Sequence, residues 1–300
     1  MKTTLQTLLA SEGPVIADGG MGTMLQAMGL ARGESPESWN VERPDEVRRI
    51  HREYIDAGAQ IILTNSFGGN RFRLERHGLA DRAAELNTAA ARLARAEVDA
   101  VARPVVVGGS MGPTGQMFVP MGTLEFDQAV EAFAEQARAL AAGGVDVFWI
   151  ETMSDLEEVR AAVEGCRRAA PEMPLVATMT FDTKGRTMMG VKPEQALAAI
   201  SGWGVLALGG NCGNGPDEIE GVIQKMRAAN DRIPLIAKAN AGLPRMEDGV
   251  AVYDATPDVM AGHAARARDL GARIIGACCG SSPDHIRSMA RALAETTSTT

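Results

Sequence analysis

Three of the four cysteines lie in two short motifs that contain glycine. Cys212 stands in NCG, and Cys278 and Cys279 stand side by side in ACCG, each motif closing an apolar run. Three thiolates that meet at one point can hold zinc at Zn–S distances of about 2.3 Å, and they leave the fourth tetrahedral position open for a substrate. A thiol that binds there is deprotonated and stays nucleophilic at neutral pH. This chemistry suits the transfer of an alkyl group to a substrate thiol.

The alternatives for the adjacent cysteines are two buried thiols or a strained, redox-active disulfide. Cys212 favours the metal site, because it adds a third cysteine at the end of another apolar run. Cys166 lies within a helical pattern, and we expect it to be a small buried side chain.

The chain that must position these motifs has one repeated pattern of apolar runs and helical segments. Short runs rich in Val, Ile and Leu alternate with helical patterns, as expected of parallel strands that are buried on both faces. Eight such units in about 290 residues match a single-domain (β/α)8 TIM barrel, and an open doubly wound sheet is the alternative. The eight runs span residues 15–20, 61–67, 105–113, 145–153, 174–182, 205–213, 234–242 and 273–280.

We divide the chain into a helical lead-in at 1–12, the barrel at 13–295 and a disordered tail at 296–300. The clearest helices are predicted at 44–58, 127–144, 155–170 and 257–271. The βα loops that are longer than average, and therefore suited to specificity, span 19–43, 113–126 and 243–256.

The carboxyl ends of barrel strands converge on one mouth, which is where barrel active sites lie. The cysteines then close strands six and eight, and Gly280 lets the backbone turn so that Cys278 and Cys279 both face inward. The strand between them ends at Asn240, which we expect to be a weak, displaceable oxygen ligand. An aldolase-type barrel would instead need a Schiff-base lysine, and Lys238 lies inside the same strand.

Composition excludes several other classes of function. The formal net charge is −8 and no cluster of Lys and Arg exceeds a pair, so nucleic-acid binding is not expected. No apolar run approaches the roughly 18 residues that span a membrane, and the first residues lack the pattern of a signal peptide. A cytoplasmic location, where thiols stay reduced, is therefore predicted.

Motifs at the ends of all eight runs carry a further signal. They are DGGMGTMLQ (18–26), TNSF (64–67), GSMGPTG (109–115), ETMSDLEEVRAA (151–162), MTFDTKGRTMMG (179–190), NCGNGP (211–216), NAG (240–242) and GACCGSSPDHI (276–286). Together they resemble the homocysteine S-methyltransferases, a family that includes betaine–homocysteine methyltransferases and the homocysteine-binding module of cobalamin-dependent methionine synthases. Ala277 departs from the family pattern, which usually has a second glycine there, and its methyl group is expected to crowd the metal slightly.

The resemblance implies that Cys212, Cys278 and Cys279 hold Zn2+ and that the thiolate of homocysteine takes the fourth position. This zinc-bound thiolate would attack a methyl donor and form methionine, with no separate protein nucleophile.

The resemblance also implies that Asp18 and Glu151 receive the amino group of homocysteine, because two carboxylates suit an ammonium ion. Capping or structural carboxylates are the alternative. We further expect the backbone amides of Gly19 and Gly20 to hold the substrate carboxylate, and Asn240 to occupy the zinc site before the substrate arrives.

The methyl donor is predicted to be methylcobalamin, a methyl-corrinoid, carried by a separate protein. Betaine-type members have an aromatic residue after the second strand that helps to box a quaternary ammonium, whereas this chain has Gly68 and Gly69 there. The chain also ends at residue 300 without a cobalamin or folate domain. Methionines expected near the mouth, as an adaptable rim for a bulky donor, are Met21, Met24, Met111, Met117, Met121, Met153, Met179, Met188 and Met189.

Two alternatives to this function stay open. One is a small onium donor, such as betaine, S-methylmethionine or a dimethylsulfonium compound, with Trp39 as a replacement aromatic. The other is of a different class, a non-catalytic barrel subunit that holds zinc.

Overall fold

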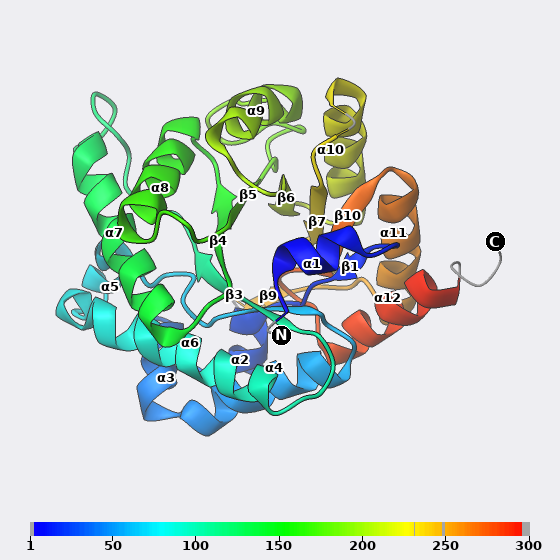
Figure 1. The fold of residues 1–300 in the computed structure, drawn as a ribbon, viewed down its shortest axis with the longest axis horizontal. Helices are drawn as coiled ribbons and strands as arrows, with labels where there is room; N and C mark the ends of the chain where they lie inside the picture. Colours follow the sequence, from blue (N-terminus) through cyan, green and yellow to red (C-terminus); the bar gives the residue numbers. More distant parts are fainter. Residues whose placement is uncertain (1–2, 231, 248–249, 296–300) are drawn as a thin grey trace.

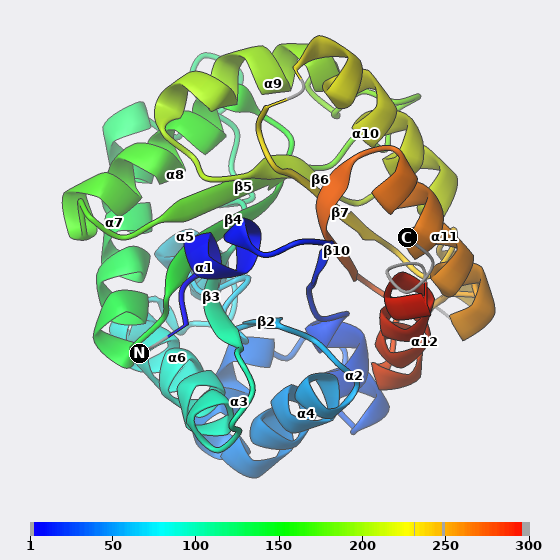
Figure 2. The same ribbon diagram turned by 45° about the vertical axis from the view of Figure 1, so that its right-hand side comes forward.

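A ring of parallel strands forms the centre of the computed structural model, which describes residues 3–230, 232–247 and 250–295 (Figures 1 and 2). The strands of the ring are β1 (Val15–Ile16), β2 (Ile61–Leu63), β3 (Val106–Met111), β4 (Val147–Met153), β5 (Leu175–Met179), β6 (Leu208–Cys212), β7 (Leu235–Ala239) and β10 (Ala272–Ala277). They pair in the order β1, β10, β7, β6, β5, β4, β3, β2, and a parallel bridge between Ala17 and Ile61 joins the two ends of this row. The predicted (β/α)8 barrel is confirmed, and the predicted tail at 296–300 lies outside the described residues.

Most helices surround the ring, and α1 (Leu5–Ala10) lies over its centre (Figure 2). The other helices are α2 (Met21–Ala27), α3 (Trp39–Glu42), α4 (Pro44–Asp56), α5 (Arg71–Glu75), α6 (Ala83–Asp99), α7 (Phe126–Gly143), α8 (Leu156–Ala169), α9 (Pro193–Ile200), α10 (Pro216–Ala229), α11 (Pro257–Asp269) and α12 (Pro283–Glu295). The four helices predicted from sequence are found as α4, α7, α8 and α11 with ends within two residues of those expected. Helix α4 begins and ends close to where its sequence predicted. Pro44 lies in its first turn, and Gly58, with φ +112°, follows its last turn.

Apolar side chains along each strand alternate between two clusters, because successive side chains of a strand point to opposite faces. Ile62, Val107 and Phe148 point outward and pack with the surrounding helices. Ile61, Val106 and Val147 point inward and fill the barrel. Toward the carboxyl end of the barrel the inward positions become polar, so the interior changes from packed core to candidate site along the same strands.

Helix α1 closes the opposite end of the barrel, where the strands begin. Its Leu5 is fully buried and Leu8 nearly so, and both pack with the inward cluster that contains Val15 and Val147. Thr4 caps the helix by accepting a hydrogen bond from the backbone N–H of Thr7 at 3.1 Å. The lead-in segment therefore contributes side chains to the barrel core.

Two of the long loops at the mouth have structure of their own. Residues 19–43 contain α2, the short 3-10 helix η1 (Pro36–Ser38) and α3, and residues 243–256 contain an antiparallel hairpin of β8 (Arg245–Glu247) and β9 (Val250–Val252).

Within the described residues, no helix has both the length and the apolar character that crossing a lipid bilayer requires.

The plug formed by α1 generates a prediction about stability. Leu5→Ala should lower the free energy of unfolding by about 2–4 kcal/mol, because the cavity it leaves lies in the barrel interior. The matched control Gln6→Ala changes an exposed side chain of the same helix and should stay within about 0.5 kcal/mol of the parent. Urea unfolding followed by circular dichroism measures both free energies. Equal effects of the two changes would contradict the role of Leu5 in filling the end of the barrel.

Candidate functional site

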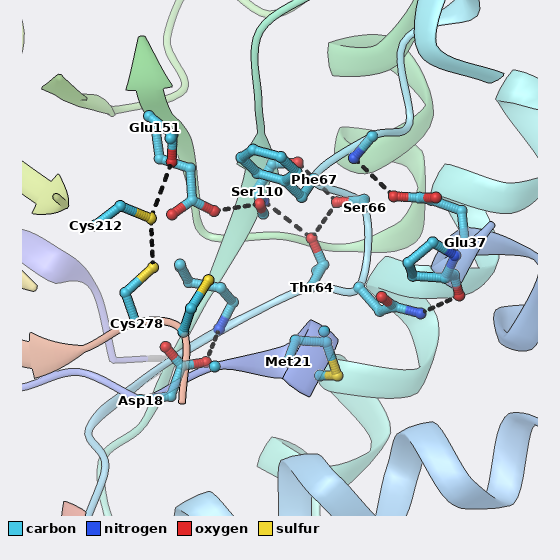
Figure 3. A pocket seen from close by; sticks show the side chains of 18 of the residues that line it. Asp18, Met21, Glu37, Thr64, Ser66, Phe67, Ser110, Glu151, Cys212 and Cys278 are labelled. Carbon is cyan, nitrogen blue, oxygen red and sulfur yellow. Dashed lines mark hydrogen bonds between the residues drawn. The ribbon is translucent and has the colours of Figure 1, made fainter. Parts of the chain in front are cut away.

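A cavity of about 420 Å³ opens among the carboxyl ends of the strands. Asp18, Glu151, Cys212 and Cys278 lie at one end of it, Phe67 lies near the middle beside Ser110, and Glu37 lies at the other end (Figure 3). The volume is typical of a site for small molecules.

The three predicted cysteines meet in this cavity, and Figure 3 shows Cys212 and Cys278 facing each other. The Sγ atoms of Cys212 and Cys278 are 2.9 Å apart, and those of all three cysteines lie within 4.8 Å of one another. Hydrogen bonding to Cys278 and Cys279, together with burial, raises the pKa of Cys212 well above that of an ordinary thiol. Three thiolates therefore need a cation among them to lose their protons together.

Strand pairing explains why the thiols meet. Cys212 on β6 and Ala277 on β10 both pair with Ala239 of β7, one from each side. Cys212 has φ +60° and Gly280 has φ +80°, so the backbone leaves the regular pleat beside both motifs. A left-handed conformation costs a residue with a Cβ about 1–3 kcal/mol, and such residues are concentrated at functional sites. The predicted turn at Gly280 is confirmed.

Glu151 reaches the cavity at an irregular point of β4. The register of β4 against β5 shifts between Ile150 and Met153, as at a β-bulge, a feature that re-aims side chains next to active sites. Ser110 Oγ donates a hydrogen bond of 2.5 Å to Glu151 Oε1. Burial raises the pKa of Glu151 to about 7, and the neighbouring Cys278 adds to the increase.

Asn211, which no sequence signal marked as functional, supports the thiols from inside the barrel. Its Oδ1 accepts hydrogen bonds from Thr152 N at 2.8 Å and from Thr178 Oγ1 at 2.7 Å. These contacts direct its Nδ2 to 3.5 Å from Cys212 Sγ and 3.9 Å from Cys278 Sγ. An N–H donor beside a sulfur favours the thiolate form.

Both carboxylate oxygens of Asp18 already have partners within the protein. Lys238 Nζ donates to Asp18 Oδ1 at 2.6 Å, and the backbone N–H of Leu63 donates to Oδ2 at 2.7 Å. Burial opposes the charge on Lys238, but Asp18 and Glu151 outweigh burial and raise the pKa of Lys238 above its usual value. The lysine is therefore protonated, which does not suit a Schiff-base nucleophile.

Gly19 and Gly20 line the cavity and press against the second cysteine motif. A Cβ at Gly19 would lie 2.4 Å from Ser281 Oγ, and one at Gly20 would lie 2.7 Å from the carbonyl oxygen of Cys278. The Gly20 amide, predicted to hold a substrate carboxylate, donates instead to Ser281 Oγ at 3.0 Å. Tyr54 adds hydrogen bonds to the carbonyls of Gly20 and Ser281 at 3.1 and 3.2 Å.

The loop at 243–256 also reaches the cysteines. The ring of Tyr253 packs against Gly280 so closely that a Cβ there would lie 2.1 Å from the ring's Cγ. Burial, the charge of Cys279 and a hydrogen bond to Cys279 raise the pKa of Tyr253. Loop length predicted a functional segment here, but it gave no means of choosing this tyrosine.

Three residues discussed from sequence lie outside the cavity wall. Asn240 Nδ2 donates to the carbonyl of Gly213 at 2.7 Å, while its buried Oδ1 has no hydrogen-bond partner among the described residues. Trp39 is buried and stacks with Arg43, so it does not face the cavity. The methyl group of Ala277 packs in the outward cluster against the helices, so the expected crowding of the metal is not found.

The fold and this cluster define a (β/α)8 barrel with three cysteines at its mouth, and comparison with known proteins gives the family. The family model for homocysteine S-methyltransferase matches residues 15–293. The chain therefore belongs to the homocysteine S-methyltransferase family.

Two curated relatives are similar over nearly the whole chain. The methionine synthase of Mycobacterium tuberculosis is 36% identical over 298 residues, which are 95% of this chain and 25% of that protein. The methionine synthase of Mycobacterium leprae is 35% identical over 294 residues, 93% of this chain and 24% of that protein. The chain thus spans about a quarter of the length of these relatives.

Solved structures share the fold. The homocysteine methyltransferase MmuM from Escherichia coli, in its metallated form, superposes with a TM-score of 0.81 at 24% identity and covers 96% of this chain and 99% of that one. A methyltransferase from Methanosarcina mazei superposes with a TM-score of 0.61 at 13% identity, covering 99% of this chain and 100% of that one.

The raised pKa of Glu151 predicts a dependence of stability on pH in the metal-free protein. The folded state keeps this proton up to about pH 7, whereas the unfolded chain releases it near its usual pKa of 4.5. The unfolded state therefore binds fewer protons in this window, and stability falls as pH rises. Glu151→Gln removes this loss, so its stability relative to the parent should increase by about 3 kcal/mol between pH 4.5 and pH 8. Urea titrations of both proteins with a chelator present measure the difference, and a difference independent of pH would refute the assignment.

Proposed function

We propose that the protein is a zinc-dependent homocysteine S-methyltransferase that forms methionine. The observation that carries the proposal is the meeting of Cys212, Cys278 and Cys279 in a cavity that also contains Glu151. Family membership supports homocysteine as the methyl acceptor. Homocysteine has eight non-hydrogen atoms, so a cavity of about 420 Å³ leaves room beside it for a second reactant.

The donor set fits zinc. Three soft sulfur ligands would suit this ion, and the cavity that the cysteines line would leave room for a fourth ligand. Asn211 supplies the outer contact that orients ligand sulfurs in metal sites. The unpaired Oδ1 of Asn240, on the strand between the two cysteine motifs, is the oxygen that could complete the site without substrate.

When zinc is bound, it supplies the positive charge that keeps a substrate thiol deprotonated at neutral pH. The rest of the reaction depends on how the chain holds homocysteine. Glu151, fixed by Ser110, is positioned to receive the ammonium group as a charge-assisted hydrogen bond. Asp18 attracts the ammonium group through its charge rather than through a direct hydrogen bond, because both of its carboxylate oxygens are bonded to Lys238 and Leu63.

We propose that the methyl donor is a methyl-corrinoid presented by a separate corrinoid protein. A Cβ at Gly68 would lie 2.9 Å from Glu37 Oε1 and one at Gly69 would lie 2.3 Å from Asn87 Oδ1, so an aromatic wall for a small cation at either position would require Glu37 or Asn87 to move. Trp39 does not replace it, since that ring is buried away from the cavity.

Exposed methionines on the loops around the mouth support a large apolar donor. Met117, Met121 and Met188 are 51%, 62% and 73% exposed on the loops that follow β3 and β5. Flexible thioethers are suited to packing against a broad apolar partner. Met111, Met153 and Met179, also expected near the mouth, are fully buried in the core and take no part in this rim.

The first test concerns the metal. Cys278→Ala should lose tight zinc binding and homocysteine methylation together, because one of three ligands is gone, while circular dichroism shows an intact barrel. Cys166→Ala, which changes a cysteine buried in α8, should keep a full equivalent of zinc by mass spectrometry of metal content. Retention of full zinc occupancy by the Cys278 variant would show that the site is elsewhere.

The second test concerns the donor. Zinc-loaded protein with homocysteine should form methionine from methylcobalamin, and should form none from betaine, S-methylmethionine or dimethylsulfonioacetate. Turnover with one of these onium compounds and none with methylcobalamin would reverse the choice of donor. Zinc and homocysteine binding without turnover from any donor would instead favour the non-catalytic barrel subunit.

A further inference from the structure

Lys238 is a buried cation in the wall of the cavity whose bonding capacity is only partly used. Its side chain is 2% exposed, and its ammonium group has three N–H donors. Asp18 takes two of them, through Oδ1 at 2.6 Å and through its carbonyl oxygen at 3.2 Å. The ammonium group also lies over the ring of Trp149, 5.9 Å from its centroid, but among the described residues no third hydrogen-bond acceptor is bonded to Nζ, and Lys238 borders the cavity.

Three hydroxyl groups and one backbone amide at this end of the cavity already donate to acceptors within the protein. Ser110 Oγ donates to Glu151, Ser66 Oγ donates to the carbonyl of Ser110 at 2.8 Å, and Thr64 Oγ1 bonds with Ser66 Oγ at 2.6 Å (Figure 3). The Gly20 amide donates to a serine oxygen of the cysteine loop. These hydroxyl groups and the Gly20 amide therefore have no free hydrogen to donate to an incoming anion.

We propose that Lys238 binds the α-carboxylate of the amino-acid substrate, an inference that rests on the proposed function. The cysteine cluster then receives the thiol, Glu151 the ammonium group and Lys238 the carboxylate. These three receptors match the three functional groups of a thiol amino acid.

The charges around the cavity favour such a cation. Asp18 repels a carboxylate that enters this end, and Glu151 and the cysteine sulfurs do so once they have lost their protons. Lys238 Nζ is bonded to Asp18, and the charges of Glu151 and Cys278 help to raise the pKa of Lys238. The other cationic side chains in the cavity wall, Arg73 and Arg76, come from the segment at and after α5, which forms the wall together with Phe67. Asp18 holds the ammonium group of Lys238 in place and so acts as its positioning residue.

Binding of two ligands tests this role. One is homocysteine, and the other is 3-aminopropane-1-thiol, which has the same thiol and amine but no carboxylate. Calorimetry on the zinc-loaded protein gives a dissociation constant for each, and the ratio of the two constants isolates recognition of the carboxylate. Lys238→Met alone would leave Asp18 buried without its partner, so the informative comparison is between D18N and the double variant D18N/K238M.

The parent should prefer homocysteine over the aminothiol by about 10- to 150-fold, the worth of a hydrogen bond to a charged group. D18N should keep part of this preference, because the carbonyl oxygen of residue 18 still accepts from Lys238. The double variant should bind the two ligands equally, with zinc content unchanged. The surface control Lys225→Met should keep the full preference.

A preference that survives in the double variant would overturn the proposal, as would its loss in Arg73→Gln, which would place the carboxylate at the other end of the cavity. A parent protein that binds neither thiol would instead mean that the proposed function has failed.

Discussion

The pairing of β6 and β10 with opposite edges of β7 is the constraint on which the site depends. Cys212 and Ala277 face the same residue, Ala239, so both cysteine motifs leave the barrel at one level. A slip of one residue in either pairing would turn every side chain of that strand to its other face. Both faces of these strands are buried, one by the barrel interior and one by the helices, and burial on two sides specifies the register strongly.

The same convergence collects groups that repel one another. Two carboxylates and three thiols surround one lysine in a protein whose formal net charge is already −8. The structure tolerates this because burial raises the pKa of Glu151, because hydrogen bonding to Cys278 and Cys279 together with burial raises the pKa of Cys212, and because Lys238 neutralises Asp18. Such a site is incomplete without positive charge, which a divalent metal and a substrate ammonium group would supply.

Much of this arrangement could be predicted from the sequence, because its strongest signals are periodic or chemical. Apolar runs gave the strands, Gly58 and Pro44 bounded a helix, and cysteines at two strand ends indicated that the thiols would meet. The partners of Asp18 could not be predicted, since Lys238 is 220 residues away and its inward direction depends on the final register. The bulge that places Glu151 and the burial of Trp39 also arise from tertiary packing, which leaves no local pattern.

The plug at α1 and the cysteine cluster lie at opposite ends of the same strands. A strand of six or seven residues rises by about 20 Å, which is well beyond the range over which substitutions usually influence one another. The residues that stabilise the barrel at α1 are therefore separate from the residues of the candidate site. Substitutions that improve the packing around Leu5 and Leu8 should therefore raise stability without disturbing the candidate site. The added stability would then offset the cost of destabilising substitutions in the loops at the mouth.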